Sequence, residues 1–170
     1  MSEQPSVEER KKWHRYFGVE CNNRAWHLAD SETRSTEEDT EMLHTAHAAA
    51  LHWAAQGVAL NNARAEMLLG HVYALLGEGG SAMRYARASF DFLAAHDSLD
   101  WEMAFAHAIL AHAAVAANDT ALYRAHYAKA DEIGAILGEE DRAIFRKTFA
   151  VIPAPKADRG VEIGEGSRES

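Results

Sequence analysis

The distribution of proline constrains the fold of this chain more than any other feature of its sequence. Proline occurs only at positions 5, 153 and 155, so the stretch between Ser6 and Ile152 lacks the residue that interrupts helices most strongly. The chain also contains 34 alanines, and alanine has the highest helix propensity. Valine, isoleucine and threonine are sparse and rarely alternate with polar residues, so strands are not indicated. The sequence therefore predicts an all-α fold.

Start and stop signals divide this stretch into about seven helices. Two capping boxes, each a serine followed three residues later by a glutamate, begin at Ser6 and Ser35. Gly57, Gly77 and Gly138 suit helix ends, because glycine adopts the left-handed conformation without strain. The predicted helices cover about 7–29, 36–56, 60–76, 81–96, 100–118, 120–137 and 139–151. We expect one domain over residues 1–152 and a disordered polar tail over 153–170.

An internal repeat indicates how the helices pack. Its first copy consists of Leu69-Gly70, Tyr73, Gly77, Ala82 and Ala86. A weaker copy follows about 41 residues later, with Leu110-Ala111 in place of Leu69-Gly70 and Asn118 in place of the turn glycine. The small residue lets two helices approach closely. A helix pair of this kind buries its apolar face only by stacking on its neighbours.

Residues 60–137 resemble tetratricopeptide-like repeats of the longer, roughly 40-residue variety. The second copy departs from the pattern at Ala114, where an aromatic residue is expected. The segments His44-Thr-Ala-His47 to His52-Trp53 and Asn62-Ala-Arg64-Ala-Glu66 also resemble an uncharacterised bacterial family. These resemblances imply antiparallel helices in a right-handed α–α superhelix and a bacterial origin, and they bring no activity with them.

In such a stack the first helix of each pair lines a concave groove. The offsets from Gly70 and Ala111 place one set of candidate ligand-binding residues there: Arg64, Met67, His71, Leu75, Phe105 and His112. At 100° per residue, Arg64, His71 and Leu75 lie within about 40° of one another, so a charged, a titratable and an apolar residue share one helix face. We therefore predict a binding or adaptor module that recognises a peptide or protein partner, with no cofactor.

The histidines, ten in all, support an alternative function. The short turn near residue 58 sets residue i opposite about residue 117 − i, which places His71 between His44 and His47 on the neighbouring helix. His112 occupies the repeat position of His71. Imidazole binds zinc and other transition metals, so the alternative is a small-molecule or metal-binding protein, including an enzyme, with His44, His47, His71 and His112 as ligands. Histidines that only fill partly buried positions are the simpler interpretation.

The sequence lacks the common catalytic signatures, namely a glycine-rich phosphate loop, a Gly-x-Ser-x-Gly turn, a His-Glu-x-x-His helix and a cysteine pair. This absence favours a protein that is not an enzyme, and the enzyme alternative stays open.

Charge and hydropathy narrow the partner and the compartment. The net charge of −9 argues against nucleic acid and anionic membranes as partners. No run of about 18 apolar residues occurs, and the first residues lack the apolar segment of a signal peptide. Cys21 is the single cysteine, so no internal disulfide forms. We expect a cytoplasmic protein, with a homodimer left open.

Overall fold

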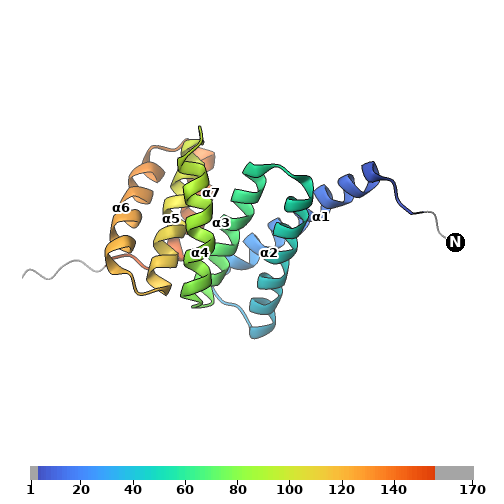
Figure 1. Ribbon diagram of the computed structural model, residues 1–170. Helices are drawn as coiled ribbons and strands as arrows, with labels where there is room; N and C mark the ends of the chain where they lie inside the picture. The colour runs from blue at the N-terminus through green and yellow to red at the C-terminus, as the bar shows by residue number, and fades with distance from the viewer. Residues whose placement is uncertain (1–3, 156–170) are drawn as a thin grey trace, which may run out of the picture.

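A computed structural model describes residues 4–155, and within them the chain forms seven α-helices and no strand (Figure 1). The all-α class predicted from the sequence is confirmed. The predicted tail lies outside the described residues from position 156 onwards. The helices are α1 (Val7–Ala29), α2 (Thr36–Gln56), α3 (Ala59–Leu75), α4 (Gly79–Ala94), α5 (Asp100–Ala116), α6 (Thr120–Ile136) and α7 (Glu139–Ala150).

The ends of several helices carry the predicted caps. The backbone N–H of Glu9 donates to Ser6 Oγ at 3.2 Å, and the Ser6 N–H donates to the Glu9 carboxylate at 2.8 Å. Ser35 and Glu38 repeat this arrangement at the start of α2. Gly57 and Gly77 have φ angles of 71° and 75°, the left-handed conformation that ends α2 and α3 and favours glycine.

The helices form a row in which each contacts the next. Figure 1 shows α1 and α2 at one end of the row and α6 at the other, with α3, α4 and α5 between them. The odd-numbered helices also contact one another in sequence, α1 with α3, α3 with α5, and α5 with α7. These contacts between helices do not specify the handedness of a superhelix, so the right-handed superhelix stays a prediction.

The core has two parts that meet around α3. One lies between α1, α2 and α3 and includes Leu28, Met42 and Leu68. The other surrounds α5, which is buried on most of its circumference, and extends through α4 and α6 to Phe145 and Phe149 of α7. Trp26 packs against both parts. A helix this enclosed is rich in alanine because small side chains let several neighbours approach at once.

Gly70 lies where α3 and α4 approach most closely, as the repeat predicts. A Cβ atom at this position would stand 2.9 Å from the backbone nitrogen and 3.1 Å from the Cα of Ala86. The obstruction is backbone, which cannot rotate away, so the position accepts only glycine at the present helix spacing.

No helix within residues 4–155 is both long and apolar enough to cross a membrane.

We expect Gly70→Ala to lower the free energy of unfolding by roughly 1–3 kcal/mol, because the added methyl group forces α3 and α4 apart. Urea denaturation followed by circular dichroism measures this value. Gly80→Ala is the matched control, since a Cβ at Gly80 meets no atom within 4 Å. The control should be neutral or slightly stabilising, because alanine favours helix over glycine. Equal stability of the two variants would show that the close approach is absent in solution.

Candidate binding pocket and buried histidine pairs

A pocket of about 470 Å³ lies among the odd-numbered helices. Its volume falls within the range of about 300–1,000 Å³ typical of ligand sites. Residues from one helix are spaced by three, four or seven positions, so each helix presents a single face to the pocket. The lining residues are Asn22, Trp26 and Asp30 of α1 and its C-cap, Trp53 of α2, Asn61, Arg64 and Met67 of α3, Trp101 and Phe105 of α5, and Asp141, Ile144 and Thr148 of α7.

Four aromatic rings line the pocket. Trp26, Trp53 and Trp101 are half-buried, and Phe105 is buried. The Trp26 ring meets Phe105 edge to face, with ring centroids 5.9 Å apart and an interplanar angle of 80°. Phe105 meets Trp101 in the same way at 6.2 Å. Edge-to-face contacts hold aromatic rings in fixed orientations, so this wall is formed before any ligand enters.

Arg64 is held by a buried carboxylate. Its Nη2 lies 2.7 Å from Oε1 of Glu102, and its Nε donates to the same oxygen at 2.9 Å. The second carboxylate oxygen of Glu102 accepts the backbone N–H of Leu99 at 2.9 Å. The guanidinium also lies over the Trp101 ring, 5.1 Å from its centroid. The positive charge of Arg64 is thus compensated within the protein, and Glu102, only 2% exposed, has both oxygens occupied.

The half-buried Asp30, by contrast, has no ion-pair partner among the described residues. Thr148 Oγ1 donates to its Oδ1 at 3.1 Å, and no other side chain of residues 4–155 bonds to this carboxylate. Burial raises the pKa of Asp30, and the Thr148 bond and the charges of Lys147 and His27 only partly offset this effect. The pocket therefore contains a carboxylate that forms no ion pair within the described residues.

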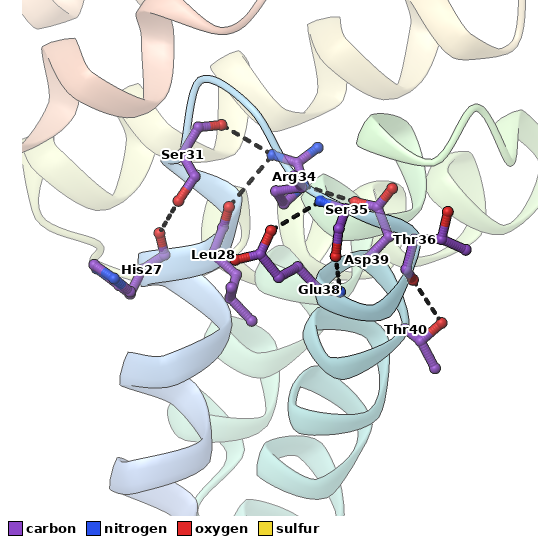
Figure 2. Close-up of polar contacts among 9 residues, drawn as sticks. All are labelled: His27, Leu28, Ser31, Arg34, Ser35, Thr36, Glu38, Asp39 and Thr40. Atoms are coloured by element: carbon purple, nitrogen blue, oxygen red, sulfur yellow. Dashed lines mark hydrogen bonds and ion pairs between the residues drawn. The ribbon is translucent and has the colours of Figure 1, made fainter.

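The connection between α1 and α2 fixes the position of Asp30. Asp30 is the C-cap of α1, and its backbone N–H donates to the Trp26 carbonyl at 2.9 Å. Figure 2 shows Arg34 bridging this connection: it donates to the carbonyls of Leu28 and Ser31 and pairs with Asp39 of α2 at 2.7 Å. The loop that carries the pocket carboxylate is thus braced against both helices.

Three of the six predicted groove residues, Arg64, Met67 and Phe105, line the pocket. His71 and His112 are on the predicted helices but are buried behind the wall, and Leu75 packs against the core between α1 and α2. Their positions correct the prediction that all six lie on one ligand-facing surface. His71 and Leu75 share the α3 face of Arg64 but lie about two and three turns further along the helix. There Trp26 covers His71, and the core between α1, α2 and α3 covers Leu75.

The sequence did not predict that α1 and α7 contribute to the pocket, through Trp26, Asp30, Asp141 and Thr148. The repeat pattern covers neither helix, so it could not place their faces. The one available signal was the spacing of Asn22, Trp26 and Asp30, which puts two polar residues and an aromatic residue on one stripe of α1.

His71 and His112 form a buried pair behind the pocket. Their Nδ1 atoms lie 3.1 Å apart, so one ring donates and the other accepts, and the accepting ring must be uncharged. Burial lowers the pKa of His112 to about 4 and that of His71 well below its usual range. Trp26 stacks on His71 with ring centroids 5.5 Å apart. The neutral pair therefore supports one wall of the pocket.

The other predicted metal ligands do not join this pair. His47 bonds through Nε2 to the Tyr73 hydroxyl at 2.8 Å and contacts the Tyr85 ring. The predicted register is nearly correct, but His47 meets the α3 face that carries Tyr73. This face lies about 200° around the helix from His71. His44 is exposed. Within residues 4–155, no three His, Cys, Asp or Glu side chains come close enough to hold a metal ion.

Two further histidine pairs have the same geometry. His14 and His52 join α1 to α2, and His107 and His126 join α5 to α6, each through Nδ1 atoms 2.9 Å apart. Burial and the neighbouring His126 lower the pKa of His107 to about 4. Six of the ten histidines thus form side-chain links between helices.

Comparison with known proteins gives no relative for this chain. No protein-family model, no curated protein and no solved structure matches it. Its function therefore has to be inferred from the site itself.

The lowered histidine pKa values predict acid sensitivity. An unfolded histidine binds a proton below about pH 6.5, whereas His112 resists protonation until about pH 4 when folded. The unfolded state binds more protons in this window, so we expect the free energy of unfolding to be constant above pH 7 and to fall as the pH drops toward 4. His112 alone should contribute a loss on the order of 3 kcal/mol. Urea denaturation at several pH values measures the curve.

His112→Gln should flatten this curve between pH 6.5 and 4.5, above the range in which ordinary carboxylates titrate. His96→Gln is the control, because His96 follows the end of α4, is exposed, and its ring bonds only to the Phe92 carbonyl. A parent curve that stays level down to pH 4.5 would contradict the buried neutral pairs.

Proposed function

We propose that this protein is a non-enzymatic binding module that recognises a peptide segment of a partner protein. In this proposal the segment lies across α1, α3, α5 and α7, and one of its side chains enters the pocket. The observation that carries the proposal is the combination, in one pocket, of rigid aromatic walls with two amide side chains that have no partner among the described residues.

The amides are Asn22 and Asn61. Both are half-buried and line the pocket, and neither side chain forms a hydrogen bond within residues 4–155. A side-chain amide offers donors and an acceptor, the groups needed to bond to the C=O and N–H of a peptide backbone. An extended peptide has no internal partners for those groups, so it gains more from the two amides than a small apolar molecule would.

The spacing of the helices supports a concave binding surface. The odd-numbered helices contact one another, whereas α2, α4 and α6 make at most marginal contact among themselves. A stack with closer spacing on one side curves toward that side. This is the expectation for the tetratricopeptide-like right-handed superhelix, which we retain as part of the proposal.

The remaining features favour a protein partner in a reducing, cytoplasmic setting, in keeping with the bacterial resemblance. The net charge of −9 disfavours nucleic acid and anionic membranes. Burial and the nearby Glu20 raise the pKa of the Cys21 thiol, so it lacks the thiolate character of a nucleophile. A metal-dependent function draws no support, because His47 contacts the Tyr73 face of α3 and not the His71–His112 pair, and His44 is exposed. The homodimer stays a prediction that native mass measurement would test.

Selection from a phage-displayed library of random peptides, with the full chain as bait, tests the function. Isothermal titration calorimetry then compares selected peptides on matched variants. We expect Asn22→Ala and Asn61→Ala to weaken binding by roughly 3–10-fold, the value of one hydrogen bond. Asn23→Ala should change nothing, because Asn23 is exposed and lies outside the pocket.

Failure to enrich any peptide, or equal affinity for all three variants, would overturn the proposal. A small molecule that co-purifies with the protein and blocks the selected peptides would point to a metabolite site instead.

A further inference from the structure

We propose that the pocket recognises a positively charged side chain of the partner peptide, with the Asp30 carboxylate and the Trp26 ring as the two groups that bind the cation. This inference rests on the proposed function, since it specifies which side chain the peptide inserts.

The charges that line the pocket leave a negative excess. Arg64 is neutralised by Glu102 at 2.7 Å, whereas neither Asp30 nor Asp141 takes part in an ion pair among the described residues. Thr148 occupies one oxygen of Asp30 and orients the group, which leaves Oδ2 for a ligand. Lys147 and His27 lie near enough to affect the carboxylate, but neither bonds to it. The pocket thus has room for one added positive charge.

The aromatic wall favours the same ligand. A cation is attracted to the face of an aromatic ring, most strongly to tryptophan. His71 stacks on Trp26 with an interplanar angle of 27°, and Phe105 meets the ring edge to face. The part of the Trp26 ring that these contacts leave uncovered lines the pocket. Because the histidine pair behind it is neutral, no positive charge there opposes a cation at the ring.

The cation subsite formed by Asp30 and Trp26 lies at a different height along the helices from Arg64. Arg64 meets Glu102 and His71 meets His112, so α3 and α5 run in the same direction. The pairs Arg24–Glu41 and His14–His52 show that α1 and α2 are antiparallel, and a short turn reverses the chain again into α3, so α1 runs in the direction of α3. Trp26 is level with His71, Arg64 precedes His71 by seven residues and Asp30 follows Trp26 by four, so the Cα atoms of Arg64 and Asp30 stand roughly 16 Å apart along the helix direction. Asp30 is also the C-cap of α1, and the partial negative charge of a helix C-terminus adds to its attraction for cations.

The test uses two probes that differ only at the tip of the side chain: N-acetyl-lysine methylamide and the uncharged N-acetyl-norleucine methylamide. Tryptophan fluorescence and ¹H–¹⁵N spectra of the indole groups report binding to the full chain at pH 7. We expect the lysine probe to bind at least about tenfold more tightly than the norleucine probe, as a desolvated carboxylate contact and a tryptophan face together would provide.

Asp30→Asn keeps the acceptor for Thr148 but removes the charge, so it should reduce lysine binding to the norleucine level. Glu32→Gln is the control, since it removes one negative charge two residues away on an exposed side chain outside the pocket. Affinity of the parent for the lysine probe should also fall as the pH is lowered through the raised pKa of Asp30, while Asp30→Asn loses this dependence. Circular dichroism verifies that each variant is folded.

Equal binding of the two probes, no binding of either, or an unchanged affinity in Asp30→Asn would overturn the inference. Its failure is distinct from that of the proposed function. Selected peptides that depend on Asn22 and Asn61 but contain no basic residue would leave the function standing without the cation subsite. Lysine binding at Asp30 without enrichment of any peptide would support the cation subsite and overturn the proposed function.

Discussion

The structure depends on close approach between helices at a few small residues. Gly70 of α3 faces the backbone of Ala86 in α4, where a single methyl group would have no room. Gly79, at the start of α4, approaches the backbone of Ala116 and Ala117 at the end of α5 in the same way. These contacts are backbone against backbone, so larger side chains cannot rearrange to relieve a change of spacing. They set the distances between neighbouring helices, and the pocket and the histidine pairs depend on those distances.

The histidine pairs show how fixed spacing turns polar residues into structural links. An imidazole pair joined through two Nδ1 atoms tolerates only a narrow distance between helices, and at least one of its rings must be uncharged to accept the bond. His71 and His112 meet this requirement between α3 and α5, which lie side by side because α4 packs closely on α3 and also contacts α5. The buried ring of His71 in turn supports Trp26, so a polar pair deep in the core determines the orientation of a pocket wall.

Much of the fold could be predicted from the sequence, because its signals are local. Ser6 and Ser35 with their glutamates, together with Gly57 and Gly77, define helix ends through contacts within a few residues. The repeat spacing also identified Gly70 as the close-packing position. The pocket was only partly predictable, since Arg64, Met67 and Phe105 lie on helices covered by the repeat. The positions of α1 and α7 depend on contacts between residues distant in sequence, such as Asp30 with Thr148, and no local pattern specifies them. The metal hypothesis placed His47 at nearly the correct height along α3 but against the wrong face of that helix. The height follows from the length of the turn between α2 and α3, whereas the face that His47 contacts depends on tertiary packing.

The two charged groups of the pocket differ in a way that the fold itself imposes. Glu102 is fully buried, so an unpaired charge there would be costly, and Arg64 together with the Leu99 backbone satisfies it completely. Asp30 stands at a helix end with access to the pocket, so burial raises its pKa without forcing it to acquire a partner within the protein. A ligand cation would recover the interaction energy that Asp30 lacks, whereas a ligand anion at Arg64 would have to compete with a buried ion pair already formed. This asymmetry, more than the net charge of the chain, determines which sign of charge the pocket can bind.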